Sequence, residues 1–433
     1  MKNLKFLITA LVVLMLCFSL VACGGGKDTG DGDGTPKEKI TLTVWGSQED
    51  QEMLKEMCAA YAAANPDKEY KFLFGVQGEG DAADKVLNDV TSGPDVFSFA
   101  SDQINKLIAG GALARIGGQA ETDVKANNTL TSVQSASVTI NGESQLFAYP
   151  CTEDNTLFLY YDKSVIGADQ IDTLDELLDA AHAKGKTVHF KLNDDGWYLS
   201  SFFFAYDDLA YNVTYDDALK ETGVTINYNN AQGLAVMKAL VKYVNHPALV
   251  IQTDDSKLIA GFTPTAEGVV EAAAGVSGIW NAKAIGALLG DNMGVAKLPT
   301  VEIDGQQKQL TTYMGCKLIG VNGYSQQKGE AHKLAQWLTN EQNQIKRFEA
   351  RGFGPSNVKA AANEAVQNDY VLSAVLAQAQ YSRAQTSVPG NYWTPMASLI
   401  TPFIERKEEG TLLDYTDAEL QELLDALVAQ IAK

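Results

Sequence analysis

The sequence predicts an α/β protein built from two bodies, and three observations carry that prediction. The chain has 433 residues, which is more than a single hydrophobic core usually serves. Between residues 40 and 99, short apolar runs alternate with segments of helical periodicity, and the same alternation returns after residue 187. A succession of strand, helix and strand is typical of a largely parallel sheet with helices on its faces.

The first body is predicted from the residues that come after Ile40. Runs rich in β-branched and aromatic residues indicate strands, and the segments between them place apolar residues at helical spacing. The first helix should end before Pro66, which cannot continue it. The predicted strands are 40–45, 70–74 and 95–99, and the predicted helices are 48–65 and 81–93.

The same pattern recurs later in the chain. "TVHFKL" predicts a strand, "YNNAQGLAVMKALVKYVN" a helix, and "KLIGVN" another strand. Two more helices have their own start signals, because Thr173 with Glu176 and Thr416 with Glu419 each form a capping-box pattern. We therefore expect two α/β bodies in one chain.

The N-terminal residues predict an export signal. Two lysines precede an apolar run that extends to Ala22, which is the layout of a secretory signal. "LVAC" at residues 20–23 resembles a bacterial lipoprotein box, in which Cys23 becomes the lipidated first residue. We therefore expect a signal peptide over 1–22 and localisation on the extracellular face of the cytoplasmic membrane, with the lipid as the only membrane contact.

Residues 23–39 should form a flexible tether, because "GGGKDTGDGDGTPKEK" offers no apolar side chain to a core. Behind it only Cys58, Cys151 and Cys316 remain. An odd number of isolated cysteines predicts no disulfide framework, and we expect all three to be small buried residues.

Charge and missing motifs exclude several functions. The net charge of −20 repels phosphates, so nucleic acid is not expected as a partner and an uncharged ligand is favoured. The four histidines have no partner at i+3 or i+4, so no metal site is expected. Nucleotide-binding glycine motifs and the nucleophile elbow are absent, and no cofactor is expected.

Acids and amides stand next to aromatic residues at several places. Asp102 follows the strand end in "GPDVFSFASDQ", where open α/β sheets bind ligands, although Ser101 or Asp102 could equally cap the next helix. Flat rings offer apolar contact faces, and carboxylates accept hydroxyl hydrogen bonds. A sugar presents both kinds of group, so Trp197, Trp280 and Trp393, which have polar neighbours, become candidates despite the frequent use of aromatics in cores.

Two other functions remain open on the residues alone. Paired carboxylates such as Asp102 and Asp194 also suit a secreted glycoside hydrolase, for which their separation would decide the mechanism. An adhesion protein that recognises a surface glycan is the third class.

Six segments of the chain resemble a known family. "LTVWG", "GPDVFSFASDQINKLIAGGAL", "FAYPCTEDNTLFLYYDK", "VSGIW", "GVAKLPT" and "VPGNYWTPM" together resemble the family-1 extracellular solute-binding proteins of ABC sugar importers, most of all the maltose/maltodextrin-binding proteins. The resemblance runs from about Ile40 to the C-terminus. It implies a non-enzymatic, monomeric receptor that closes on an oligosaccharide and delivers it to a membrane permease, with xylo- or arabino-oligosaccharides as alternatives to malto-oligosaccharides.

The resemblance also implies a two-lobed periplasmic-binding-protein-like fold, each lobe a largely parallel sheet flanked by helices. Three interlobe crossings are implied near 151–154, 295–299 and 352–355. The implied lobes are 40–150 with 299–351, and 155–294 with 355–433.

Ligand-binding positions carry over residue by residue. In the first lobe, Phe99 matches an aromatic near the sugar, Asp102 matches a carboxylate that binds hydroxyls, and Gln103 stands where the maltodextrin pattern has a basic residue. The acid at the hinge matches either Glu153 or Asp154.

In the second lobe, Asp194 matches an acid of the family. Its neighbouring stacking ring is Trp197 or Tyr198, Trp280 matches a platform tryptophan, and Trp393 matches the principal stacking tryptophan, flanked by Tyr392.

Overall fold

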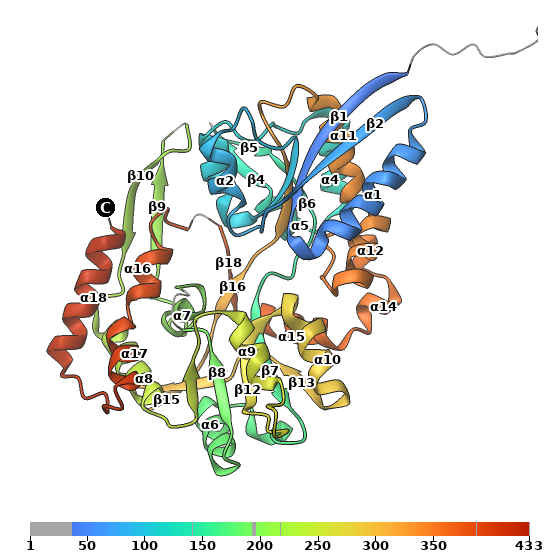
Figure 1. Ribbon diagram of the computed structural model, residues 1–433. Coiled ribbons are helices and arrows are strands. Elements are labelled where there is room, and N and C mark those ends of the chain that lie inside the picture. The colour runs from blue at the N-terminus through green and yellow to red at the C-terminus, as the bar shows by residue number, and fades with distance from the viewer. Residues whose placement is uncertain (1–36, 141, 193–195, 217, 387, 433) are drawn as a thin grey trace, which may run out of the picture. The chain divides into compact units, whose positions relative to one another are not determined.

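The computed structural model describes residues 37–140, 142–192, 196–216, 218–386 and 388–432 (Figure 1). The predicted signal peptide, Cys23, most of the predicted tether and Asp194 lie outside these residues. The chain divides into two units after Glu38, and the unit that begins at Lys39 holds both lobes. Within the described part of the chain, no helix is both long and apolar enough to cross a membrane.

The first lobe is a five-stranded mixed sheet flanked by helices (Figure 1). Its strands lie in the order β2, β1, β3, β17, β6. The strands are β1 (Glu38–Gly46), β2 (Lys68–Val76), β3 (Val96–Ala100), β6 (Ala148–Pro150) and β17 (Lys317–Val321), with a hairpin of β4 (Ser137–Ile140) and β5 (Glu143–Leu146). The helices are α1 (Gln51–Ala64), α2 (Ala82–Asn88), α3 (Ile104–Ala109), α4 (Gly118–Asn127), α5 (Leu130–Ser135), α11 (Lys328–Leu338) and α12 (Glu341–Arg351).

The second lobe is also built on a five-stranded sheet, in the order β11, β8, β12, β7, β13. The sheet strands are β7 (Leu157–Asp162), β8 (Thr187–Phe190), β11 (Leu249–Ile251), β12 (Ala272–Gly278) and β13 (Met293–Ala296), and two further pairs are β9 (Tyr211–Tyr215) with β10 (Glu221–Ile226) and β14 (Thr300–Ile303) with β15 (Gln306–Gln309). The helices are α6 (Leu174–Ala183), α7 (Gly196–Phe203), α8 (Ala231–Val244), α9 (Asp255–Phe262), α10 (Ala282–Leu289), α15 (Tyr370–Ala379), α16 (Trp393–Ser398), α17 (Thr401–Glu408) and α18 (Asp417–Ile431).

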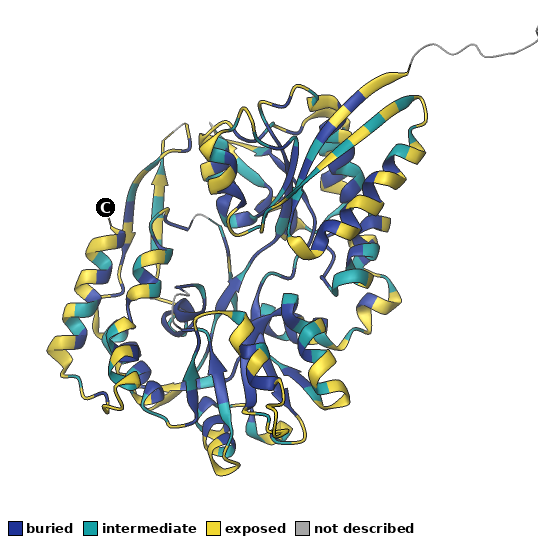
Figure 2. Ribbon diagram, viewed as in Figure 1, coloured by how far each residue is buried: buried dark blue, intermediate teal, exposed yellow. Residues whose placement is uncertain are grey.

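Helices cover both faces of the second sheet. Alternate residues of β7 point to opposite faces, as the period of a strand requires. Leu159 and Tyr161 enter the core that includes α6 and α8, whereas Phe158 and Tyr160 enter the core that includes α9, α10 and α15. Every residue of β7 and β12 is therefore buried, as Figure 2 shows.

The predicted α/β architecture is confirmed, but the sheets are mixed rather than largely parallel. In the first sheet β1 and β3 run parallel, while β17 is antiparallel to both β3 and β6. In the second, β8 runs parallel to β11 and β12, while β7 is antiparallel to β12 and β13. Every antiparallel pairing in these two sheets involves β7 or β17. The chain enters each of these two strands from the other lobe, and not from a crossover helix of the same lobe.

The predicted bounds of most of these strands and helices agree closely with the structure. The predicted strands at 40–45, 70–74 and 95–99 correspond to β1, β2 and β3, and α1 ends at Ala64, before Pro66. Thr173 and Thr416 accept the predicted capping bonds from the backbone N–H of Glu176 and Glu419. The predicted helix 81–93 is shorter than expected, since α2 ends at Asn88.

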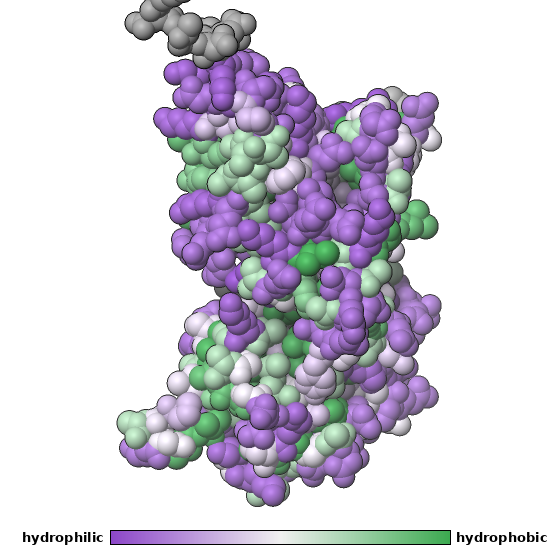
Figure 3. All heavy atoms as spheres, turned by 90° about the vertical axis from the view of Figure 1, so that its right-hand side faces the viewer, coloured by the Kyte–Doolittle hydropathy of each residue, from purple (hydrophilic) through white to green (hydrophobic). Residues whose placement is uncertain are grey.

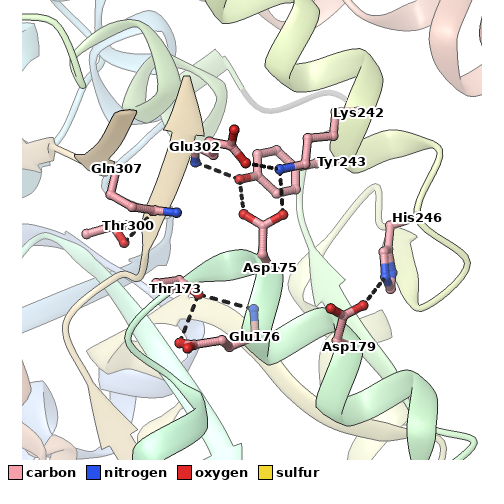
Figure 4. A network of polar contacts seen from close by, with 10 residues as sticks. All are labelled: Thr173, Asp175, Glu176, Asp179, Lys242, Tyr243, His246, Thr300, Glu302 and Gln307. Atoms are coloured by element: carbon pink, nitrogen blue, oxygen red, sulfur yellow. Dashed lines mark hydrogen bonds and ion pairs between the residues drawn. The ribbon is translucent and has the colours of Figure 1, made fainter. Parts of the chain in front are cut away.

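The second connection lies further along the chain than 295–299, and the reason is a network that holds β14 in the second lobe (Figure 4). The Tyr243 hydroxyl on α8 donates to Asp175 of α6 at 2.7 Å and accepts the backbone N–H of Glu302 at 2.7 Å. Lys242 adds ion pairs to Asp175 and Glu302. Val301 and Ile303 of β14 are buried in the second-lobe core, so the chain leaves this lobe only at β16 (Thr312–Met314).

The connections meet in a hydrogen-bonded hinge. Asn155, between β6 and β7, exchanges backbone bonds with Gly315, between β16 and β17, and its side-chain amide donates to Gln385 at 3.1 Å. Gln385 follows β18 (Ser382–Ala384), which pairs in parallel with β16. The third connection begins at Gly352, whose left-handed backbone ends α12, and passes α13 (Val358–Ala361) and α14 (Glu364–Gln367) before α15.

The three described cysteines are free and buried, as predicted. Desolvation raises the pKa of the Cys58 thiol to about 12 and also raises the pKa of Cys151 and of Cys316. Cys151 and Cys316 lie at the hinge, and Cys58 lies in α1 within the first-lobe core.

Candidate ligand-binding site

A cavity of about 940 Å³ is lined by residues of both lobes and of the hinge. Its volume falls within the range of ligand pockets in proteins. The lining residues are Ser47, Glu49, Gly78, Glu79, Gly80, Ala100, Asp102, Gln103, Asn155, Trp197, Ile259, Trp280, Asn281, Lys283, Ala284, Ala287, Lys317, Arg351, Gln385 and Trp393.

Asp102 lies where the sequence predicted a polar group, at the end of β3. It does not cap a helix: neither the short 3₁₀ turn Ser101–Gln103 nor α3 has a side-chain cap, and the Ser101 hydroxyl instead accepts the backbone N–H of Cys316. Among the described residues, no hydrogen-bond partner reaches Asp102 Oδ1. Asp102 therefore lines the cavity with one carboxylate oxygen that is buried and accepts no hydrogen bond from these residues.

Burial shifts the pKa of Asp102. Desolvation raises the pKa of this carboxyl to about 6, although its own backbone N–H, Lys106 and the indole of Trp393 favour the charged form. Asp102 belongs to the first lobe and Trp393 to α16 of the second, so these two side chains meet across the cavity.

Gln103 positions a loop of the first-lobe wall. Its amide nitrogen donates to the carbonyls of Glu79 and Gly80, at 3.0 and 2.5 Å, and its oxygen accepts the backbone N–H of Ala83 at 3.0 Å. A neutral amide can both donate and accept in this way, whereas a basic side chain can only donate. Gln103 thus lines the cavity while its polar atoms hold the loop that carries Glu79.

Three indoles form the second-lobe wall. Trp197 and Trp280 are stacked, with ring centroids 5.8 Å apart and planes 26° apart. Trp393 stands edge-on to Tyr313 and Tyr392, with centroid distances of 5.5 and 5.2 Å. All three indoles are half-buried, so each has a packed side and a side available to a ligand.

Close packing of α7 and α16 brings two of these indoles together. Trp197 is the second residue of α7, and Trp393 is the first of α16. A Cβ on Gly196 would lie 2.7 Å from the Trp393 carbonyl oxygen and 2.8 Å from the Met396 Cβ. Only glycine at position 196 allows the two helix starts to approach this closely.

Three predicted contact residues do not reach the cavity, because their rings fill the cores. Phe99 is fully buried in the first-lobe core, and Tyr198 and Tyr392 are buried in the second. The Tyr392 hydroxyl is bonded to those of Ser200 and Tyr228, each at 2.9 Å. These residues support the walls, and the ring of the pair Trp197 or Tyr198 that faces the cavity is Trp197.

The two predicted hinge acids also point away from the cavity. Asp154 is fully buried and accepts the backbone N–H of Gly354 at 2.6 Å, which ties the first connection to the third. Glu153 accepts the Thr129 hydroxyl at 2.5 Å. Burial raises the pKa of both carboxyls, and the hinge residue that does line the cavity is the next one, Asn155.

The described residues contain no group of three or more His, Cys, Asp or Glu side chains able to hold a metal ion. Two cations of the lining are engaged with the protein. Arg351 pairs with the buried Asp50 at 3.0 Å, and the Lys317 ammonium lies 3.8 Å from the ring centroid of Phe353.

The comparison with protein families decides the identity of the chain. The family described as bacterial extracellular solute-binding protein matches residues 56–373, which is more than half of the sequence.

The chain belongs to the bacterial extracellular solute-binding proteins.

Three relatives of this solute-binding protein are informative. The galactooligosaccharide-binding protein of Bacillus subtilis (strain 168) is 29% identical over 407 residues, which cover 90% of each chain. The maltotriose-binding protein of Pyrococcus abyssi (strain GE5 / Orsay) is 23% identical over 360 residues, which cover 81% of this chain and 71% of that protein. A solved structure with acarbose is 31% identical, with a TM-score of 0.77, and the match covers 91% of this chain and 99% of that one.

Sequence reasoning missed several lining residues of this solute-binding protein. Asn155 and Gln385 come from the connections between the lobes, where the chain has no periodicity that marks a side chain as facing a cavity, and Lys317 is the first residue of β17. Ala284 and Ala287 come from one face of α10, and their spacing after Trp280 could have revealed them. Ser47, Glu49 and Glu79 were not missed: they stand near strand ends, the sequence left open whether they contact a ligand, and all three line the cavity.

Proposed function

We propose that this protein is the lipid-anchored solute-binding component of an ABC importer and that it binds malto-oligosaccharides in the cavity between its lobes. The observation that carries the proposal is the composition of the cavity. Indoles on the second-lobe wall face carboxylates of the first lobe across a space of about 940 Å³. A short neutral glucan has apolar C–H faces for the rings and hydroxyl groups for the acids.

A ligand that touches both walls would favour closure. A ligand shifts a conformational equilibrium only if it binds one state more tightly, and a sugar held by Trp393 and Asp102 together gains contacts when the lobes approach. Hinge bending of rigid lobes is an established way to enclose a ligand. The hinge around Asn155, Gly315 and Gln385 supplies such a joint.

The relatives support an oligosaccharide as the ligand. One is named for galacto-oligosaccharides and one for maltotriose, and a similar structure was solved with acarbose. Micromolar affinity corresponds to about −8 kcal/mol. A few ring contacts and several hydrogen bonds to carboxylates, at roughly 1.5–3 kcal/mol for each charged bond, reach this value after the entropy losses of binding.

Calorimetric titration of the purified protein with maltotriose tests the proposal, and we expect micromolar binding. Matched titrations with xylotriose and arabinotriose should show weaker binding. Absence of heat and of a thermal shift with every malto-oligosaccharide would reject the assignment.

Galacto-oligosaccharides are a second candidate, favoured by the 29% identity to the galactooligosaccharide-binding protein over 90% of both chains. The same titration with galactotriose separates the two. Binding of galactotriose at least tenfold tighter than maltotriose would replace the first proposal by the second.

A hydrolase is disfavoured by membership of a solute-binding family. The hydrolase hypothesis paired Asp102 with Asp194, which lies outside the described residues. Incubation with maltodextrins followed by chromatography should show unchanged chain lengths, and shortened products would indicate a glycoside hydrolase.

Lipid attachment is a separate part of the proposal. It rests on the sequence "LVAC" at residues 20–23. Mass spectrometry of protein from a bacterial membrane fraction should find Cys23 as the lipid-modified first residue, and Cys23→Ser should release the protein from the membrane. Recovery of unmodified protein from the soluble fraction would contradict the anchor.

A further inference from the structure

The stacked pair of Trp197 and Trp280 is held from outside the cavity, and its geometry limits how a ligand can use it. The ring centroids are 5.8 Å apart and the planes 26° apart. A sugar ring placed between two indoles needs contact distances of about 3.5–4 Å on both of its faces, or roughly 7–8 Å between the indole planes. No ring fits between Trp197 and Trp280, so they form one composite surface.

Two features fix the orientation of Trp280. Its indole N–H donates to Asp255 Oδ2 at 2.8 Å. Its six-membered ring lies over Gly278, where a Cβ would come within 2.0 Å of the ring. The backbone at Gly278 is itself held, because its carbonyl accepts the buried Tyr160 hydroxyl at 2.9 Å.

Asp255 is in turn oriented by its surroundings. It is the first residue of α9, immediately after the N-cap residue Asp254. The Ser277 hydroxyl donates to Asp255 Oδ1 at 3.3 Å, and the side-chain amide of Asn281 donates to that hydroxyl at 2.9 Å. Ser277 of β12 therefore holds the carboxylate that holds the indole, and Asn281, the residue after Trp280, orients Ser277.

We infer that Asp255 is a positioning residue that presets the Trp197–Trp280 platform before ligand arrives. The inference rests on the proposed function for its binding consequence only. Asp255 is not among the cavity-lining residues, so it acts through Trp280. A preset platform avoids the cost of ordering an aromatic side chain on binding, which is how preorganisation raises affinity.

The platform can contact a glucan chain from one side only. A composite surface of two indoles offers one broad apolar area to a single face of a glucan chain, with the carboxylates of the opposite wall available to the hydroxyl rim. Loss of the Asp255 bond frees Trp280 to turn away from Trp197, which removes one broad contact area and leaves two separate rings.

Circular dichroism of the ligand-free protein tests the platform directly, because two stacked indoles produce an exciton couplet. The couplet is identified as the part of the wild-type spectrum that disappears in Trp197→Phe, which has only one indole of the pair. We expect Asp255→Ala to lose most of it, and Asp255→Asn, which keeps an acceptor oxygen, to retain it. Gly278→Ala should also lose it, because the added methyl group displaces the ring without touching Asp255.

Asp254→Ala is the matched control. It removes the neighbouring carboxylate and the N-cap bonds to the backbone of Ser256 and Lys257, but it leaves the Trp280 bond in place, so the couplet should persist. Maltotriose titration should then show about fivefold weaker binding for Asp255→Ala, as expected when one aromatic side chain must be ordered on binding, and wild-type affinity for Asp255→Asn.

An unchanged couplet in Asp255→Ala, or an equal loss in Asp254→Ala, would overturn the positioning role. A lost couplet with unchanged affinity would overturn the part of the inference that concerns binding. If wild type binds no maltotriose, the proposed function fails while the couplet still decides whether Asp255 presets the platform.

Discussion

The two walls of the cavity are built by different means. The first-lobe wall consists of polar groups on loops and strand ends, and Gln103 fixes its Glu79 loop with bonds to three backbone positions. The second-lobe wall is dominated by indoles at helix starts and on a 3₁₀ turn, which pack against a buried core, and Trp280 is also held by its bond to Asp255. Polar contacts hold the Glu79 loop of the first-lobe wall, whereas the apolar area of the second-lobe wall is presented by packing together with one partly buried polar contact.

The exposed surface shows a related contrast between the lobes. On the face shown in Figure 3, hydrophilic residues dominate the first lobe, in the upper part of the view, and hydrophobic residues are more frequent over the second. The apolar character of the second lobe is therefore not confined to the cavity wall.

The largest expected effect comes from breaking the apolar wall. Trp393→Ala removes an indole that contacts Asp102 across the cavity, and maltotriose affinity should fall at least tenfold, or about 1.4 kcal/mol. Trp45→Phe is the matched control, because Trp45 is also a half-buried tryptophan but does not line the cavity. Unchanged affinity in Trp393→Ala by calorimetry would remove this residue from the site.

The next effect concerns the charge of the polar wall. Asp102→Asn should weaken maltotriose binding by about fivefold to tenfold, because a charged acceptor becomes a neutral one. The same change should raise the free energy of unfolding at about pH 7.5 by about 1–2 kcal/mol, since it removes a desolvated charge. Chemical denaturation at fixed pH measures the second effect.

The pH dependence of this stability gain has a definite sign. The folded-state pKa of Asp102 is raised to about 6 from its ordinary value of 3.8, so between these values the folded state binds more protons and wild-type stability falls as pH rises. The advantage of Asp102→Asn should therefore shrink as pH is lowered from about 7.5 to about 4. An advantage that is constant over this range would contradict the raised pKa.

A smaller effect should follow from loosening the polar wall. Gln103→Ala removes the three bonds to the 79–83 loop and should weaken binding about threefold and lower the free energy of unfolding by about 1–2 kcal/mol. Gln103→Glu is an informative companion, since it keeps the acceptor for Ala83 but loses both donors to Glu79 and Gly80. Hydrogen exchange of the loop amides should rise in both variants, and protection equal to wild type would show that the loop is held by other contacts.

The smallest effect on binding is expected at Tyr392. Tyr392→Phe loses hydroxyl bonds to Ser200 and Tyr228 inside the core, so the free energy of unfolding should fall by about 1 kcal/mol while maltotriose affinity stays within about twofold of wild type. A loss of affinity comparable to that of Trp393→Ala would restore Tyr392 as a contact residue and would show that the apolar wall rearranges on binding.

Most of the fold and about half of the site could be predicted from the sequence. Strands β1 to β3 and helix α1 were predictable because periodicity and breakers are local signals. The second connection was misplaced because Val301 and Ile303 are held in the second lobe by Tyr243 and Lys242, which are distant in sequence. Phe99, Tyr198 and Tyr392 show the limit of a residue-by-residue resemblance: an aromatic residue beside polar neighbours fits a core as well as a site, and only the packed structure separates the two.

The buried thiols of Cys58, Cys151 and Cys316 have a practical consequence. With the pKa of each raised by desolvation, these thiols stay protonated at neutral pH and are poor nucleophiles. Maleimide dyes should therefore not react with these thiols in the native protein. They should react with the cysteine of a Lys283→Cys variant, because Lys283 is exposed on the second-lobe side of the cavity. The native body is in this respect ready for site-selective labelling, and a fluorophore at that rim would report lobe closure as a change in emission.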